Sequence, residues 1–205
     1  LTELNGQIAE ACELYDRDAD EITIVAVTKT HPASVIKTAA AAGLFEIGES
    51  RIQEAEPKIL ECGHIARYHL IGHLQSNKVK KAVQLFDVIQ SVDSFKLAEE
   101  ISKRCGEIER TIECFVEVNA SGEDRKFGLQ PDQFSLEIKR IAELPNIRLT
   151  GMMTMAPFVD DEEVVRGVFA KGYELFKQGQ DMIGDDFDNL SMGMSGDFAW
   201  AIAEG

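Results

Sequence analysis

Short apolar runs rich in β-branched residues alternate along this chain with longer segments whose apolar positions recur at helical spacing. An amphipathic helix is predicted first, over residues 3–15, because Leu4, Ile8, Ala11 and Cys12 fall on one face. Seven strands are then predicted, each followed by a helix. They are expected at 22–28, at 44–50, at 68–71, at 85–94, from 112 into a long polar loop, at 147–155 and at 189–195.

Strict alternation of strands and helices predicts parallel strand pairing through right-handed crossovers. An open doubly wound sheet and a closed barrel both satisfy that rule. No GxGxxG and no GxxxxGKS or GxxxxGKT follows the first predicted strand, which removes the usual signature of nucleotide-binding open sheets. Seven similar units without a composition shift favour one α/β domain over residues 1–205, a TIM-type (β/α)8 barrel with an extra N-terminal helix. The eighth strand would begin after Gly205, so it is expected to be missing from the given sequence.

The charge of the chain restricts its partners. Its 21 Lys and Arg residues against 36 Asp and Glu residues give a formal charge of −15, which repels nucleic acid. The densest basic group, Lys78, Lys80 and Lys81, is short and is expected to form a solvated helix face. No apolar run reaches about 18 residues and no signal-peptide pattern opens the chain, so neither a membrane nor export is expected. A cytoplasmic protein is predicted, and, since no apolar stripe is left unused, a monomer.

Cysteine and histidine spacing argues against a metal site. The four cysteines lie far apart with no CxxC pair, which indicates reduced thiols in a cytoplasm rather than a metal knuckle. His69 and His73 are four residues apart, but Gly72 lies between them and no helical pattern surrounds them, so no metal is expected there.

The first predicted strand ends at a lysine. Ligands of such barrels bind at the carboxyl ends of the strands, so Lys29 is a candidate site residue. Val25 and Val27 share its strand parity, and its stem is therefore expected to rise from an apolar wall. Desolvation lowers the pKa of an ammonium group and leaves more of the neutral amine that attacks an aldehyde. The alternative, on spacing alone, is a lysine that extends from a strand end into water.

A second candidate follows the seventh predicted strand, in the sequence SMGMSGDF at residues 191–198. There the chain turns through Gly193 into Ser195 and Gly196, and a helix follows. Backbone N–H groups, a hydroxyl and a helix N-terminus together suit a phosphate group. The alternative is that Ser195 is an ordinary N-cap of its helix. An amine and an anion seat at one barrel mouth would together suit a phosphorylated aldehyde.

Seven segments in order along the chain carry a resemblance to a known family. They are VAVTKTHP, EIGES, HLIGHLQSNK, SVDSFKLAEEI, VNASGEDRKFGL, LTGMMTM and MGMSGDFAWAI. From about Ile22 to Gly205 the chain resembles the YggS/PROSC family of pyridoxal 5′-phosphate (PLP) homeostasis proteins, whose fold is similar to the N-terminal barrel of alanine racemases. The resemblance implies that PLP is the cofactor and that Lys29 holds it as an internal aldimine.

The resemblance also implies roles for residues around the cofactor. Ser195 and Gly196 are expected to meet the phosphate. Three apolar side chains are expected to line the ring pocket: Ile71, Met153 and Met194. No catalytic residue and no metal ligand is implied.

The chain departs from the family pattern in two places. The family usually has Asn against the cofactor ring where this chain has Ser50, and the shorter side chain is expected to orient the ring less tightly. The family also continues past Gly205 with an eighth strand and an Arg-x-Gly-Thr loop that supplies much of the phosphate contact. Without that loop, PLP is expected to be held weakly.

Three functions are consistent with these features. The resemblance implies a non-enzymatic protein of intracellular PLP homeostasis, which carries or buffers the cofactor and delivers it to PLP-dependent apo-enzymes. The alternative, a PLP-dependent amino-acid racemase or decarboxylase, needs a further base at the substrate. Tyr15, Tyr68 and Tyr173 are predicted in helices or inside a strand, so no such base is evident and the binding protein is favoured. The third, a metal- or phosphate-sugar-handling barrel, gives Lys29 no covalent role.

Overall fold

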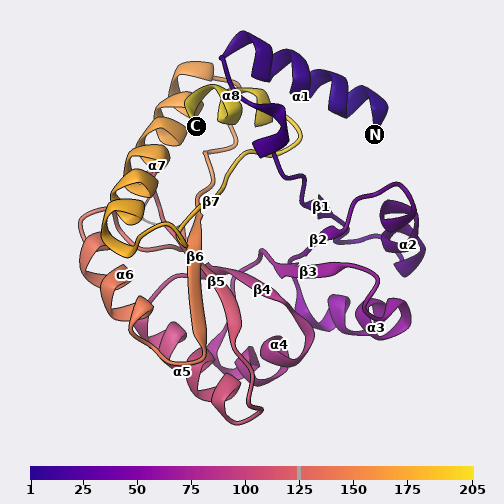
Figure 1. The fold of residues 1–205 in the computed structure, drawn as a ribbon, viewed down its shortest axis with the longest axis vertical. Coiled ribbons are helices and arrows are strands. Elements are labelled where there is room, and N and C mark those ends of the chain that lie inside the picture. The colour runs from indigo at the N-terminus through magenta and orange to yellow at the C-terminus, as the bar shows by residue number, and fades with distance from the viewer. Residues whose placement is uncertain (124–125) are drawn as a thin grey trace.

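The alternation of strands and helices predicted from the sequence is confirmed. In residues 1–123 and 126–205, which the computed structural model describes, seven parallel strands pair in chain order and form one curled sheet (Figure 1). The strands are β1 (Ala26–Val27), β2 (Glu46–Glu49), β3 (Arg67–Leu70), β4 (Val88–Val92), β5 (Ile112–Glu117), β6 (Ile147–Met153) and β7 (Asn189–Ser191). The architecture is therefore an α/β barrel of the TIM type, whose sheet runs from β1 at one edge to β7 at the other.

The helices surround the sheet, and all but the first and last cover its outer, convex face (Figure 1). They are α1 (Thr2–Leu14), α2 (Ala33–Ala41), α3 (Ile52–Cys62), α4 (Val79–Leu85), α5 (Phe95–Gly106), α6 (Phe134–Ala142), α7 (Glu162–Ile183) and α8 (Phe198–Glu204), with short 3-10 helices η1 (Ala19–Glu21) and η2 (Ser76–Lys78). The main core lies between this layer and the sheet, where Ile36 of α2 and Ile47 of β2 are completely buried. This layering gives each strand one face toward the helices and one toward the interior of the curled sheet.

The first strand is shorter than predicted. Residues 22–28 were expected to be extended throughout, but only Ala26–Val27 is regular, and it pairs with β2 alone. Ile22 and Ile24 instead pack into an apolar cluster with the first and last helices, which takes them out of the strand. The residues that lead into β1 are therefore fixed by side-chain packing and not by a ladder of hydrogen bonds.

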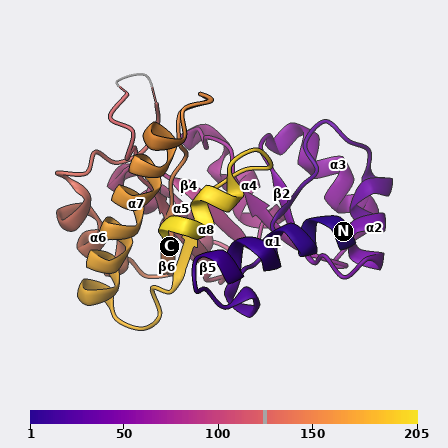
Figure 2. The same ribbon diagram turned by 90° about the horizontal axis from the view of Figure 1, so that it is seen from above.

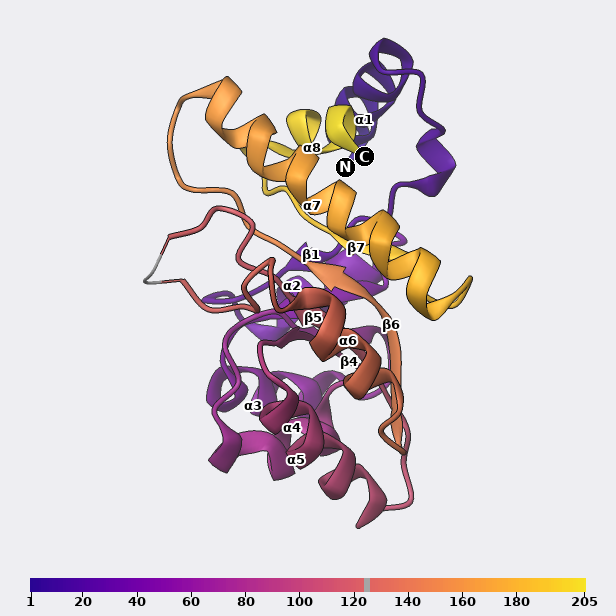
Figure 3. The same ribbon diagram turned by 90° about the vertical axis from the view of Figure 1, so that its left-hand side faces the viewer.

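That apolar cluster joins the two ends of the described chain. Ile8, Ala11 and Cys12 of α1 are buried against Ile202 of α8. Figures 2 and 3 show α8 lying between α7 and α1. Because α8 follows β7 and the cluster also holds the segment before β1, this packing ties the two edges of the sheet to each other.

Candidate functional site

The residues proposed for the site from the sequence all lie at one rim of the sheet. The carboxyl ends of parallel strands point the same way, so whatever follows them gathers at the same edge. The positions are Lys29 after β1, Ser50 after β2, Ile71 after β3, Met153 at the end of β6, and Met194, Ser195 and Gly196 after β7. Hydrogen bonds extend the sheet to this rim: Thr28 N–H donates to Gly48 O at 3.0 Å and Ile71 N–H to Glu49 O at 3.0 Å.

The apolar wall expected below Lys29 is present. Val27 pairs with Gly48 of β2, and an atom added at the missing Cβ of Gly48 would lie 3.1–3.3 Å from the side chains of Val25, Val27 and Ile71. These three side chains therefore meet over Gly48 on the inner face of the sheet, and a glycine is needed to let them approach. Ile71 is half-buried, as the lining of an open pocket should be.

Lys29 itself lies in a turn beyond the strand and is exposed to solvent. Of the two alternatives for this lysine, the structure fits the one in which it extends from the strand end into water, and the described residues do not bury its side chain. It follows β1, which pairs with β2 and, among the described residues, with no other strand. Within the described residues the lysines engaged in ion pairs are Lys37, Lys58, Lys81 and Lys126, so the Lys29 amine is left free of a carboxylate.

Ser50 lies next to Lys29 in the sheet order and is half-buried. Its backbone touches the next strand end so closely that a Cβ at Gly72 would come within 2.2 Å of the Ser50 carbonyl oxygen. Gly72 is thus required for this contact, and it fixes the two strand ends side by side.

The turn that follows β7 is open. Its carbonyl at Met194 accepts hydrogen bonds from the N–H groups of Asp197 at 3.1 Å and Phe198 at 2.9 Å, and Met194 N–H in turn donates to the Asp197 carboxylate. The helix N-cap is Asp197, so the alternative in which Ser195 caps its own helix is wrong. Among the described residues the N–H groups of Ser195 and Gly196 make no hydrogen bond, and both residues are exposed. They are available to an anion from outside.

Met153 and Met194 differ in their surroundings. Met153 is 4% exposed and lies in register with Glu117 of β5 and Ser191 of β7, so these three side chains share one face. Ser191 Oγ donates to Gln90 at 2.7 Å across the sheet, which identifies that face as the inner one. Met153 therefore points into the interior, whereas Met194 is 46% exposed at the rim.

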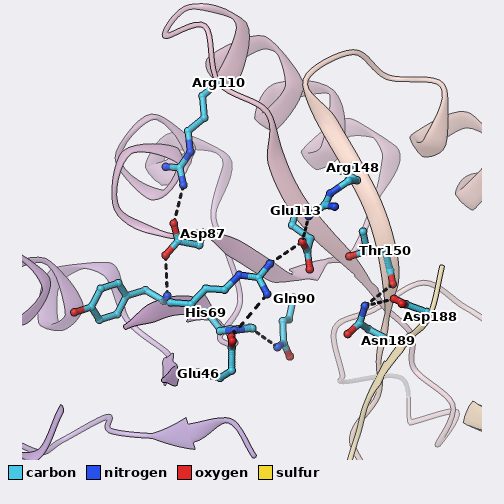
Figure 4. A network of polar contacts seen from close by, with 12 residues as sticks. Glu46, His69, Asp87, Gln90, Arg110, Glu113, Arg148, Thr150, Asp188 and Asn189 are labelled. Atoms are coloured by element: carbon cyan, nitrogen blue, oxygen red, sulfur yellow. Dashed lines mark hydrogen bonds and ion pairs between the residues drawn. The ribbon is translucent and has the colours of Figure 1, made fainter. Parts of the chain in front are cut away.

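Below the rim, the interior is filled by a hydrogen-bonded chain that the sequence analysis missed. His69 of β3 contacts the Glu46 carboxylate through Nε2 and the Gln90 side chain through Nδ1 at 2.8 Å (Figure 4). Gln90 continues the chain to Ser191. Four strands, β2, β3, β4 and β7, are thereby linked across the inside of the sheet. The His69–Glu46 contact also lowers the pKa of the Glu46 carboxyl, chiefly through that hydrogen bond.

A cluster of charged side chains extends this polar network on the inner face toward β5 and β6. Glu113 accepts from Arg67 at 2.6 Å and also pairs with Arg148, which Figure 4 shows facing it. A carboxylate that is 9% exposed is stabilised here by two guanidinium groups. The inner face beneath the candidate site is therefore polar, and its charges are paired.

One buried carboxyl near the rim has no such partner among the residues that the structure describes. Glu117 ends β5, is 6% exposed, and has its pKa raised to about 7 by burial, with a smaller contribution from the charge of Asp93. Asp93 in turn lies 3.2 Å from His73 Nδ1, and the His73 ring stacks on Phe127 at 3.7 Å between centroids. The signal in the sequence was a single acid inside the apolar run FVEVN, which the search for strand-end residues passed over.

Comparison with known proteins adds the family. The model of the alanine racemase N-terminal domain matches residues 6–204. A pyridoxal phosphate homeostasis protein of Aquifex aeolicus is 35% identical over all of this chain and 90% of its own length, and one of Pseudomonas aeruginosa is 33% identical over all of this chain and 88% of its own. The chain belongs to the family of pyridoxal phosphate homeostasis proteins. The resemblance found in the sequence is thereby confirmed.

Solved structures of this family have the same fold. PipY of Synechococcus elongatus, 35% identical, superposes with a TM-score of 0.86 in its structure without PLP, covering 97% of this chain and 94% of PipY. Its structure with PLP bound superposes with a TM-score of 0.80 over the same shares. An alanine racemase of Clostridium difficile, at 17% identity and a TM-score of 0.76, shares the fold over 94% of this chain and 54% of the racemase. None of the helices in the described residues is long and apolar enough to cross a membrane.

The raised pKa of Glu117 predicts a pH-dependent stability. A carboxyl that binds its proton more tightly when folded destabilises the fold as pH rises from the unfolded value near 4.5 to about 7. Relative to wild type, Glu117→Gln is therefore expected to gain about 2–3 kcal/mol of unfolding free energy between pH 5 and pH 8. Urea unfolding at the two pH values measures this gain. Glu174→Gln, at an exposed acid of α7, is the control, and a gain for Glu117→Gln that does not change with pH would contradict the assignment.

Proposed function

We propose that this protein binds PLP at the rim of its sheet and serves PLP homeostasis by carrying or buffering the cofactor. The observation that carries the proposal is the position of two features at one rim. Lys29, which forms no ion pair within residues 1–123 and 126–205, and the open turn at Ser195 and Gly196 follow the two edge strands of one curled sheet, and the packing of α1 on α8 ties these edges together. Membership of a family whose members carry this name, and the structure of PipY with PLP bound, support it.

The residues present fit the group. PLP supplies an aldehyde, with which a primary amine condenses with loss of water. Lys29 is assigned as that amine, because it is exposed at the strand end and has no carboxylate partner among the described residues. The Ser195 hydroxyl and the free N–H groups of Ser195 and Gly196 are assigned to the phosphate, since they are unused donors at the same rim.

The remaining assigned residues are the apolar and small side chains of the rim. Ile71 and Met153 lie on the inner face and Met194 at the edge, where together they can exclude water from an aromatic ring. Ser50, at the end of β2, is assigned beside the ring, where its short hydroxyl leaves the ring less constrained than an amide would.

The cellular setting is part of the proposal. We infer that residues 1–205 act as one PLP-binding domain, because one apolar core extends under β2 to β7 and α1 packs on α8. All four cysteines are free and buried thiols, which supports a reducing, cytoplasmic location. The protein is proposed to act as a monomer and to deliver PLP to PLP-dependent apo-enzymes.

The assignment of Lys29 is tested by its removal. Wild type incubated with PLP is expected to develop a visible absorbance band, and borohydride reduction is expected to fix the cofactor to Lys29 in a peptide map. Lys29→Ala is expected to lose both signals and to keep its circular dichroism spectrum, because an exposed turn residue contributes little to the core. Lys103→Ala, at an exposed lysine of α5, is the control. A fixed adduct at another lysine, or unfolding of Lys29→Ala, would count against the site.

The assignment of the phosphate turn is tested by comparing PLP with pyridoxal, which lacks the phosphate. Ser195→Ala is expected to weaken PLP binding roughly tenfold, since a hydrogen bond to a charged group is lost, and to leave pyridoxal binding unchanged. Ser135→Ala, at an exposed serine of α6, is the control. Equal weakening for both ligands would place the phosphate elsewhere.

The carrier is distinguished from a racemase by turnover. Wild type loaded with PLP is expected to show no racemisation of L-alanine above the rate of free PLP, because no second base is assigned at the rim. Glu117 is the group there whose pKa, about 7, would suit such a base. Turnover at enzyme-like rates that Glu117→Gln abolishes would replace the carrier with the enzyme.

A further inference from the structure

The turn that presents Lys29 has an unusual backbone. Thr28 O accepts from His31 N–H at 3.1 Å, so Lys29 and Thr30 are the two central residues of a four-residue turn. Thr30 has a φ of +66°, the left-handed region. A β-branched residue rarely adopts this region, because it is sterically unfavourable, and it persists there only when its surroundings hold it.

Two carboxylates on the outer, helix-covered face hold this turn. The Glu54 carboxylate of α3 accepts a hydrogen bond from Thr30 N–H. Glu49, at the end of β2, accepts from Thr28 Oγ1 at 2.6 Å. The residues on either side of Lys29 are thus both fixed from behind, while the lysine side chain between them is exposed.

Lys58 joins these carboxylates to the turn. Its Nζ donates to Glu49 Oε1 at 2.8 Å, to Glu54 Oε1 at 2.9 Å and to the carbonyl of Thr28 at 2.9 Å. The side chain is 8% exposed, Glu49 is completely buried, and Glu54 and Lys58 lie one helical turn apart on α3. The three protons of this ammonium group therefore all have acceptors, two of them charged.

The hydrogen bonds of Lys58 give its amine a different protonation behaviour from an amine that reacts with a carbonyl group. Burial lowers the pKa of Lys58, but its bonds to Glu49 and Glu54 together outweigh that effect, so the pKa is raised and the group stays charged at neutral pH. A protonated amine with three acceptors does not attack an aldehyde. Lys58 therefore does not compete with Lys29 for a carbonyl ligand.

We propose that Lys58 and Glu54 are positioning residues for Lys29: they hold Thr28 and Thr30 so that the turn presents the Lys29 amine to the rim. The inference rests on the proposed function, in which that amine bonds PLP. A protein can fix the backbone of a lysine through the neighbouring residues and still leave the amine of its side chain exposed. The contacts of Glu54 and Lys58 with Thr28 and Thr30 thus keep the backbone of the exposed Lys29 in place.

The experiment separates covalent capture from pocket binding with two ligands. PLP carries the aldehyde, whereas 4′-deoxypyridoxine 5′-phosphate carries a methyl group in its place and keeps the ring and the phosphate. Glu54→Ala removes the acceptor of Thr30 N–H and leaves the Lys58–Glu49 pair intact. It is expected to slow formation of the absorbance band about tenfold or more, because the amine is no longer oriented, while affinity for the deoxy analogue stays within about twofold of wild type.

A second substitution tests the backbone directly. Glycine adopts positive φ without a steric cost, so Thr30→Gly in the Glu54→Ala background is expected to restore much of the lost rate. Lys58→Met is expected to act like Glu54→Ala and Lys58→Arg to be milder, with circular dichroism used to confirm that each variant is folded. Glu56→Ala, which breaks the surface pair of α3 with Lys81, is the matched control.

Each outcome decides. A slowed band with an unchanged analogue affinity, rescued by Thr30→Gly, supports positioning. Equal loss for both ligands shows a structural role alone and overturns it, as does a band that forms at the wild-type rate in Glu54→Ala. If wild type itself gives no borohydride-fixed adduct at Lys29, the proposed function fails and the positioning role fails with it.

Discussion

The shared direction of seven parallel strands is the constraint on which the rest of this structure depends. Because all strands run the same way, residues up to 167 positions apart, Lys29 and Gly196, follow strands at the same rim. A parallel sheet needs a crossover for every strand, and the helices of those crossovers bury its outer face. The inner face is then free to carry polar groups, provided that they are paired.

The two faces of the sheet use charge differently. On the inner face, the polar side chains pair with one another. Glu113 pairs with Arg67 and Arg148, and His69 bonds Glu46 and Gln90. Outside, Lys58 and its carboxylates hold a backbone turn that would otherwise relax. Burying charges costs free energy that pairing only partly offsets, so such groups are weak contributors to stability. Their value here lies in fixing geometry, which apolar residues of the same volume would not do for Thr28 and Thr30.

The fold could be predicted from the sequence because its signals are local. The N-cap of α5 is Ser94, whose side chain accepts from Leu97 N–H, and Asp161 caps α7 in the same way through Val164 N–H. The short length of β1 could not be predicted from the sequence. It follows from the packing of Ile22 and Ile24 in a cluster with α8, which lies far along the chain. Periodicity reports which residues are apolar, and it is silent on which distant element they contact.

The candidate site was predicted in position but not in its surroundings. Strand ends mark the rim, so Lys29 and Ser195 were found from spacing. The exposure of Lys29 was one of two alternatives, and spacing could not decide between them because exposure depends on neighbours across the sheet. The partners of Thr30 were also hidden: Glu54 lies 24 residues away, and a positive φ at a threonine has no sequence signature. Glu117 was missed since a lone acid in a strand looks the same whether or not a counter-ion faces it.

In the proposed function, a carrier must release its cofactor, and the exposure of the described rim is compatible with that release. A racemase gains from excluding water, which would hydrolyse the bond between lysine and cofactor and screen the charges of the reaction. A protein that must release its cofactor needs that hydrolysis, and therefore water at the amine. Lys29 is exposed, and the donors of Ser195 and Gly196 are neutral and open to solvent, so each contact can be exchanged without unfolding. Such a site needs a fixed backbone next to a solvent-exposed amine. The hydrogen-bonded turn from Thr28 to His31 provides that fixed backbone at Lys29.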